Sequence, residues 1–140
     1  MLYAESSAVL GWLLGEPSRG GLRAMLGNAR RVAASPLTVL ECERALLRAT
    51  AAGRMTHQDL STGRALLAGA VAHWILLDID AAVLARAGQP FPAEPIRTLD
   101  AIHLATALQA RVALPDLAIL SLDRRVRRSA EELGFRVLPA

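Results

Sequence analysis

Apolar and polar positions along this chain form two kinds of block, short apolar runs and longer segments with helical spacing. The short runs predict buried strands at residues 1–5, 31–34, 71–77 and 117–120, and an edge strand at 136–138. The longer segments predict helices at residues 8–14, 19–26, 36–53, 57–69, 81–87, 98–108 and 124–133. Because helices alternate with strands, the pattern predicts an α/β fold, a mainly parallel sheet covered by helices on both faces.

Residues that favour helix ends support these boundaries. Polar side chains that accept hydrogen bonds from a first helical turn stand before most of the predicted helices. These candidate N-caps are Ser6 or Ser7, Ser35 followed by Pro36, Asp78 or Asp80, Thr98, and Asp123. Gly15 to Ser18 and Gly134 are placed to end helices. We find no internal repeat and no linker long enough to divide domains, so residues 1–140 are expected to form a single domain.

The segment from Arg97 to Leu108 contains the most informative acid. It has no Gly or Pro and is apolar on both faces, which predicts a largely buried helix with Asp100 in its first turn. The helix dipole favours a carboxylate there by up to about 1 kcal/mol, but this does not offset the burial of an unpartnered charge. Asp100 therefore either completes the helix N-terminus or points into a polar cavity.

Three other acids also interrupt apolar segments. Glu5 follows the first strand, Glu41 lies early in a long helix, and Asp123 follows the strand at 117–120. Sites in parallel sheets form outside the carboxyl ends of the strands, where Glu5 and Asp123 are expected. Clustered carboxylates resist ionising together, and Mg²⁺ or Mn²⁺ would resolve the conflict. Such a cation lowers the pKa of a bound water and neutralises charge during attack on a phosphodiester.

Each of these residues also has a simpler structural explanation. Glu41 could pair with Arg44 or Arg48 along its own helix, which is worth about 0.2 to 0.5 kcal/mol. Asp123 could only cap the helix after it. His103 could act as a general base, or could be a buried histidine bonded to a nearby hydroxyl or carbonyl. The hydroxyls of Ser7 and Ser121 could bind a phosphate or a metal-bound water, and Ser121 could equally be a plain strand-end residue.

The charge balance is compatible with a nucleic-acid partner. The formal net charge is +3, and every basic side chain other than histidine is an arginine, which binds phosphate oxygens bidentately. A GC-rich genome explains the absence of lysine equally well. The densest basic cluster is either a solvated helix face or a nucleic-acid patch; it consists of Arg124, Arg125, Arg127 and Arg128.

The remaining composition excludes several classes of protein. No apolar run approaches the roughly 18 residues of a membrane span, and the first residues lack the basic region of a secretory signal. A cytoplasmic location is therefore expected. Cys42 is the only cysteine, which excludes an internal disulfide and a multi-cysteine zinc site and predicts a buried, inert thiol.

Four segments together resemble the PIN domain, in particular the VapC-type toxins of bacterial toxin-antitoxin pairs. They are residues 2–8 (LYAESSA), 35–46 (SPLTVLECERAL), 99–107 (LDAIHLATA) and 120–125 (LSLDRR). The resemblance implies an α/β/α sandwich, a Mg²⁺- or Mn²⁺-dependent endoribonuclease site, a cognate antitoxin and a homodimer. It places Glu5, Glu41, Asp100 and Asp123 at the metal-site acids and Ser121 at the hydroxyl beside the last of them. Ser7, Arg124 and Arg125 are added here as candidate substrate-binding residues.

One departure from the family pattern keeps other functions open. The family most often has Asp where this chain has Glu5, whose carboxylate is one methylene further from the backbone. A catalytically weak module that binds RNA or a protein without cutting is therefore the main alternative to a ribonuclease toxin. A nuclease without an antitoxin, acting on structured RNA or on DNA, is a third possibility.

Overall fold

Five short parallel strands form the central sheet, in the order β3-β2-β1-β4-β5. The structure is a computed structural model and describes residues 1–15 and 21–140. The strands are β1 (Leu2–Ala4), β2 (Val32–Ala34), β3 (Ile75–Leu76), β4 (Ala118–Leu120) and β5 (Val137–Leu138). The helices are α1 (Ser6–Leu13), α2 (Leu22–Asn28), α3 (Pro36–Ala51), α4 (His57–Val71), α5 (Ala81–Ala87), α6 (Thr98–Ala113) and α7 (Arg124–Glu132).

Side chains on the two central strands alternate between the faces of the sheet, as the extended backbone requires. Tyr3 on β1 and Ile119 on β4 pack into one cluster together with buried residues of α6 and α7. Their neighbours Leu2 and Leu120 pack on the opposite face. The strands are therefore buried on both sides, which explains why their sequences are continuous apolar runs.

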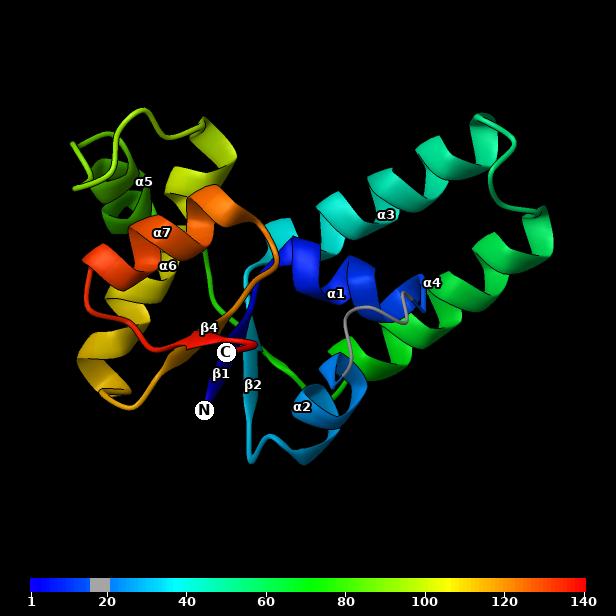
Figure 1. Ribbon diagram of the computed structural model, residues 1–140, viewed down its shortest axis with the longest axis horizontal. Coiled ribbons are helices and arrows are strands. Elements are labelled where there is room, and N and C mark those ends of the chain that lie inside the picture. The colour runs from blue at the N-terminus through cyan, green and yellow to red at the C-terminus, as the bar shows by residue number, and fades with distance from the viewer. Residues whose placement is uncertain (16–20) are drawn as a thin grey trace.

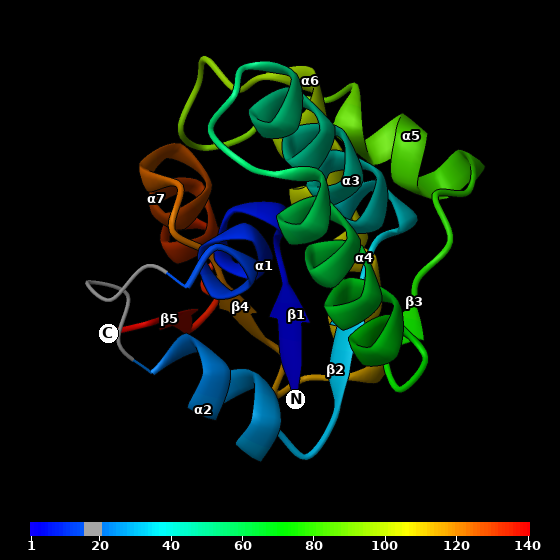
Figure 2. The same cartoon turned by 90° about the vertical axis from the view of Figure 1, so that its right-hand side faces the viewer.

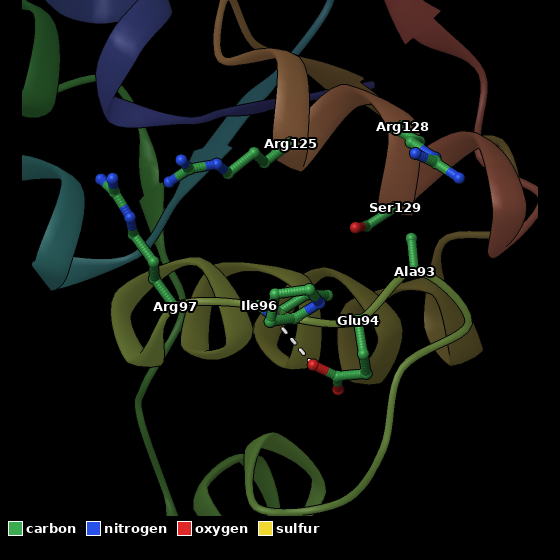
Figure 3. Close-up of a pocket in the computed structure, with 8 residues that line it drawn as sticks. Ala93, Glu94, Ile96, Arg97, Arg125, Arg128 and Ser129 are labelled. Carbon is green, nitrogen blue, oxygen red and sulfur yellow. Dashed lines mark hydrogen bonds between the residues drawn. The ribbon is translucent and has the colours of Figure 1, made fainter.

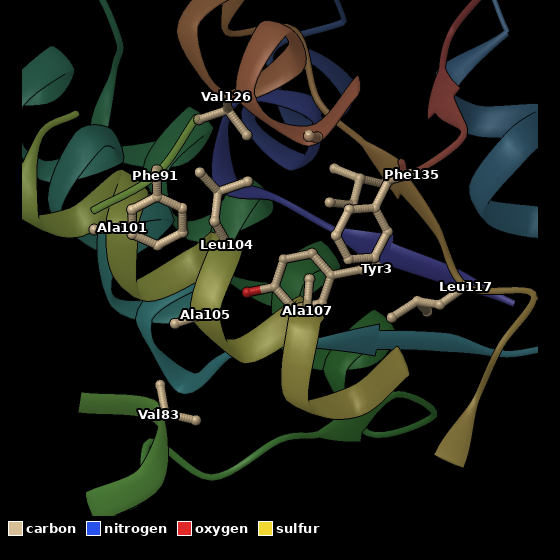
Figure 4. Packing of buried hydrophobic residues seen from close by; sticks show 12 residues of the cluster. Tyr3, Val83, Phe91, Ala101, Leu104, Ala105, Ala107, Leu117, Val126 and Phe135 are labelled. Carbon is tan, nitrogen blue, oxygen red and sulfur yellow. The ribbon is translucent and has the colours of Figure 1, made fainter. Parts of the chain in front are cut away.

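Helices cover both faces, and the predicted three-layer α/β/α sandwich is confirmed. Figure 1 shows α5, α6 and α7 on one side of the sheet and α1, α2, α3 and α4 on the other. Turned by 90°, the molecule shows β1 at the centre with α1 directly following its end (Figure 2). Between the sheet and α6, Tyr3, Leu104 and Phe135 form the centre of the larger core (Figure 4).

Several predicted helix ends are confirmed. Ser35 accepts a hydrogen bond from the Leu37 amide and Pro36 occupies the first turn of α3. Asp80 caps α5 and Asp123 caps α7. Two predicted caps are wrong. Glu5, rather than Ser6 or Ser7, caps α1, because its longer side chain turns back onto the Ser7 amide. Thr98 is already helical, and the residue before it, Arg97, makes no side-chain cap.

The predicted strand at 71–77 is much shorter in the structure. Helix α4 continues to Val71, and only Ile75 and Leu76 pair with β2. The side chains of Val71 and Trp74 pack against a cluster of buried residues that includes Val9 of α1. This packing explains why the segment is apolar although most of it is not a strand. The second helix begins at Leu22; the predicted start at 19 and part of the break at 15–18 lie outside the described residues.

Across residues 1–15 and 21–140, no helix combines the length and apolar character needed to cross a membrane.

Candidate active site

The carboxyl ends of β1 and β4 bring the first functional side chains together. Ala4 and Leu120 are partners in the parallel register, and the Glu5 amide donates to the Leu120 carbonyl at 3.0 Å. Glu5 and Ser121 are the residues that directly follow these strands. The parallel arrangement therefore places them at the same edge of the sheet, the edge at which the sequence predicts Glu5 and Asp123.

Glu5 is only 3% exposed, and serine residues hold its carboxylate. Its Oε1 accepts hydrogen bonds from the Ser6 hydroxyl at 2.7 Å and the Ser7 amide at 3.1 Å. Its Oε2 accepts from the hydroxyls of Ser7 and Ser121, the latter at 2.6 Å. The extra methylene of glutamate lets the side chain fold back over the start of α1, so both of its oxygens are occupied by donors from the chain.

Ser7 also connects α1 to the loop before α7. Its Oγ accepts hydrogen bonds from the backbone amides of Leu122 at 2.8 Å and Asp123 at 3.1 Å. Ser7 and Ser121 are therefore part of the framework that holds Glu5 and the Asp123 backbone. Their predicted contact with substrate stays a prediction.

Asp123 and Asp100 lie at the N-termini of two helices. Asp123 Oδ1 accepts from the amides of Arg125 at 2.8 Å and Val126 at 3.2 Å, so the predicted cap is present. Asp100 is in the first turn of α6 and half-buried. Burial and the negative charges of Asp123 and Glu5 raise the pKa of the Asp100 carboxyl, against smaller opposing effects of His103 and Arg97. The charges of these three acids thus act on one another, as expected for acids gathered in one site.

Glu41 joins this group through a histidine rather than through an arginine. Its Oε1 lies 2.6 Å from His103 Nε2, and His103 Nδ1 lies 2.8 Å from the Tyr3 hydroxyl. The histidine side chain is 1% exposed and that of Glu41 26%. His103 is therefore the buried, hydrogen-bonded residue that the sequence offered as one alternative, and Glu41 pairs with it instead of Arg44 or Arg48. Burial raises the pKa of the Tyr3 hydroxyl, so Tyr3 takes part in these hydrogen bonds as a neutral phenol.

Cys42 lies next to Glu41 and faces the core. It is fully buried, and burial, with the charge of Glu41 as a smaller cause, raises the pKa of its thiol to about 12. The thiol stays protonated at neutral pH, in agreement with the inert cysteine that was predicted.

The acids have the chemistry that a hard divalent cation requires. All are oxygen donors, and a positive charge among them would relieve the repulsion that raises the Asp100 pKa. Within residues 1–15 and 21–140, however, no three acidic, histidine or cysteine side chains are arranged to hold a metal ion. Glu5 is turned toward its serines and Glu41 toward His103, so the donor types fit a cation while two of the acids are engaged elsewhere.

The arginine cluster of α7 divides into separate roles. Arg127 donates to the backbone carbonyls of Ser121 at 2.9 Å and Pro139 at 2.8 Å, so it supports the end of β4. Arg124 faces a shallow cavity of about 230 Å³ beside the C-terminal residues. Arg125 faces a different cavity, of about 420 Å³, which Arg97 also lines (Figure 3). Arg124, Arg125 and Arg128 are exposed and Arg127 is half-buried, and contact of the cluster with a nucleic acid stays a prediction.

Sequence reasoning missed two features of this site. The Glu41–His103–Tyr3 chain joins residues up to 100 positions apart, and no local spacing indicates such a contact. Arg97 is not among the predicted site residues, although it lies three residues before Asp100 and directly precedes α6. The signal that could have identified Arg97 is its position directly before a helix whose first turn holds an acid in an apolar segment.

Comparison with known proteins finds relatives that match nearly the whole chain. Ribonuclease VapC46 of Mycobacterium tuberculosis is 38% identical over 137 residues, covering 98% of this chain and 95% of the relative. Ribonuclease VapC35 of the same species is 31% identical over 140 residues, covering 99% and 96%.

Two solved structures share the fold at low sequence identity. FitAB bound to an IR36 DNA fragment has a TM-score of 0.70 at 18% identity, with 99% of this chain and 94% of that chain covered. PAE2754 from Pyrobaculum aerophilum has a TM-score of 0.60 at 13% identity, with 98% and 83% covered. The PIN domain model matches residues 2–132, which include all four acids. By sequence and by fold, the chain belongs to the PIN domain family.

Proposed function

We propose that this protein is a metal-dependent endoribonuclease of the toxin class, which hydrolyses RNA phosphodiester bonds and is inhibited by a cognate antitoxin. The observation that carries the proposal is that one serine framework holds Glu5 and the Asp123 backbone at the carboxyl ends of β1 and β4, where the charges of both acids act on Asp100. The ribonuclease relatives, which match nearly the whole chain, support the choice of RNA.

The side chains of this site divide the work. Asp100 and Asp123, with Glu5 and Glu41 beside them, would hold Mg²⁺ or Mn²⁺, which when bound neutralises phosphate charge and polarises the scissile bond. The Ser7 and Ser121 hydroxyls orient the Glu5 carboxylate, and Ser7 holds the Asp123 backbone. His103 fixes Glu41 at the edge of the site. Arg125 provides a guanidinium beside the acids for the RNA backbone.

The test is RNA cleavage by the Asp100→Asn variant. We expect the variant to lose cleavage by at least about a hundredfold while its circular dichroism stays that of the parent, because the amide keeps the shape and removes the charge. Asp116→Asn is the matched control, since Asp116 is exposed in the turn before β4 and should keep full activity. Full activity of Asp100→Asn would contradict the assignment.

A catalytically weak RNA-binding module is the second candidate, and one observation favours it. Both oxygens of Glu5 are occupied by donors from the chain, which leaves this acid less available than an aspartate facing the site. Cleavage that depends on added Mg²⁺ or Mn²⁺ and disappears in Asp100→Asn would exclude this candidate. RNA binding by the parent without cleavage at any metal concentration would establish it.

Two partners complete the proposal. An antitoxin segment would place a basic group among the acids and so compete with RNA, as the charge of the site favours. A labelled RNA displaced by the co-expressed antitoxin is the expected result, and simultaneous binding of both would contradict competition. A homodimer is expected by family resemblance, and light scattering coupled to gel filtration measures it directly.

A further inference from the structure

An arginine-lined cavity lies beside the acids, between α7 and the loop that leads into α6. It has a volume of about 420 Å³, and its wall includes Arg97, Arg125, Arg128 and Ser129. In Figure 3 the side chains of Arg97 and Arg125 extend to the same side of this cavity, from opposite walls. We call this cavity the α6–α7 pocket.

The positive charge of the pocket is not balanced by the acids that line it. Arg128 donates to Glu132 at 3.2 Å in the next turn of α7. Glu94 accepts hydrogen bonds from the amides of Phe91 at 2.9 Å and Ile96 at 2.7 Å, and in Figure 3 its carboxylate lies on the loop side, away from the other two arginines. For Arg97 and Arg125, the described part of the chain provides no ion-pair partner. Two guanidinium groups therefore extend toward one region without a carboxylate between them.

Both arginines are tied to the helices that carry the acids. Arg97 directly precedes α6, three residues before Asp100, and Arg125 lies in the first turn of α7, two residues after Asp123. The charge of Arg97 acts on Asp100. A polyanion that crosses the acids toward the pocket would therefore pass directly from a negative region to a positive one.

We propose that Arg97 and Arg125 form a clamp for a phosphate of the RNA strand, next to the phosphate that is cleaved between the acids. The inference rests on the proposed ribonuclease function and adds a second binding subsite to it. Guanidinium groups bind phosphate oxygens in pairs, and two of them offset the repulsion that the acids exert on the strand. The clamp holds the backbone and contacts no base, so it supplies affinity without sequence preference.

Binding of single-stranded RNA without cleavage tests the clamp. The parent for this test is the Asp100→Asn variant with EDTA, the probe is a fluorescently labelled oligouridine, and the Kd is measured by anisotropy over a series of salt concentrations. We expect Arg97→Gln and Arg125→Gln each to weaken binding by about three- to tenfold and to flatten the dependence of log Kd on log salt by about 0.7. The double variant should lose less than the sum, because both residues hold one phosphate.

Arg54→Gln is the matched control. Arg54 is exposed and lies between α3 and α4. Figure 1 shows the connection between these two helices on the far side of the molecule from α7. The Arg54→Gln variant removes the same charge as the pocket variants, and it should change the Kd by less than about twofold and keep the salt dependence of the parent. An unchanged salt dependence in both pocket variants would overturn the clamp, as would an equal effect of Arg54→Gln.

The clamp and the proposed function can fail separately. If the pocket variants flatten the salt dependence but the wild-type protein cuts no RNA with Mn²⁺, the clamp stands and the ribonuclease proposal falls. If the wild-type protein cuts RNA and the pocket variants bind RNA like the parent, the ribonuclease proposal stands and the clamp is overturned. If the parent binds polyglutamate through these arginines and binds no RNA, the pocket serves an acidic peptide and the clamp is overturned.

Discussion

The Asp100 carboxyl makes the acid site unfavourable for folding at neutral pH. Its pKa is raised in the folded protein, chiefly by burial and then by the charges of Asp123 and Glu5. A carboxyl with a raised pKa favours the folded state while it is protonated, and this contribution is lost as the pH rises through the folded-state pKa. The site therefore stores a repulsion that a cation or a basic group of a partner would relieve.

Asp100→Asn should reveal this repulsion through pH dependence. In EDTA, we expect the Tm of the variant relative to the parent to increase as the pH rises from about 4 to about 7, because only the parent must ionise the half-buried acid. Thermal unfolding followed by circular dichroism at both values measures the difference. Asp116→Asn should show no such trend, and a relative Tm that falls with pH would contradict the sign.

Ser121→Ala tests the serine framework around Glu5. The variant removes the donor at 2.6 Å from Glu5 Oε2 in a buried environment. Hydrogen bonds to charged groups are worth about 1.5 to 3 kcal/mol, so we expect the free energy of unfolding to fall by about that amount. Urea unfolding measures it, with Ser61→Ala on the exposed face of α4 as the control. A cost below about 0.5 kcal/mol would mean that this contact does not stabilise the protein.

Single residues also show where sequence reasoning ends. Asp100, Asp123 and Glu5 were identifiable as acids out of place in apolar segments, and two of them at strand ends. The contacts of Glu5 with three serines could not be predicted from the sequence, because the direction of its side chain depends on Ser121, which is 116 positions away. The Glu41 partner was missed for the same reason: i,i+4 spacing predicts only local ion pairs, while His103 comes from another helix.

Among the elements, β1, α3 and α6 are joined by one buried hydrogen-bonded chain. Tyr3 on β1, His103 on α6 and Glu41 on α3 lie in series, with His103 between the other two. Its loss removes the His103 contact of the Tyr3 hydroxyl, near which Thr106 and Ser35 also lie, and the His103 contact of Glu41 at the site edge. The two helices on opposite sides of β1 are thereby linked around the end of the strand.

His103→Leu should cost about 2 to 4 kcal/mol of unfolding free energy, because it removes two hydrogen bonds, to buried Tyr3 and to half-buried Glu41. Tyr3→Phe, which breaks only the inner link, should cost about 1 kcal/mol. In a double-mutant cycle with Glu41→Gln, the His103 effect should be smaller than in the parent, since their contact is then already weakened. Additive costs in urea unfolding would contradict coupling between Glu41 and His103.

Helix and strand boundaries were predictable where a side chain marks them and unpredictable where packing decides. Helices α3, α5 and α7 each begin at the predicted place, because the residues that cap them, Ser35, Asp80 and Asp123, act on their own first turns. The run from 71 to 77 has strand-like composition, yet Val71 stays helical and Trp74 packs under α1. Ile75 and Leu76 are 40% and 42% exposed, so burial of side chains contributes little to lengthening this edge strand.

For the whole molecule, metal binding is measured most directly as a gain in stability. We expect Mn²⁺ to raise the Tm of the protein in a saturable way, by the equivalent of about 2.7 kcal/mol at a hundred times the Kd. Asp100→Asn should lose this response and Asp116→Asn should keep it. An equal response of all three proteins would place the cation elsewhere, and EDTA should return the Tm of the parent to its starting value.

The overall architecture was predictable because its cause is repeated along the chain. Apolar runs buried on both faces require helices on both sides, so the parallel sheet and its three layers follow from the alternation, whereas the strand order does not. The PIN domain motifs then identified the family before any contact was known. The α6–α7 pocket could not be predicted from the sequence, because it depends on how a loop with several prolines places Arg97 opposite α7.

The position of β1 at the centre of the sheet has a consequence for synthesis on the ribosome. Glu5 and Ser7 emerge first, but their partners Ser121, Leu122 and Asp123 follow about 116 residues later. At translation rates of about 5 to 20 residues per second, the delay is roughly 6 to 23 s. Until then the nascent chain has neither β4 nor the serine framework, so the ribosome that makes this protein is not exposed to a completed site while most of the chain is being translated.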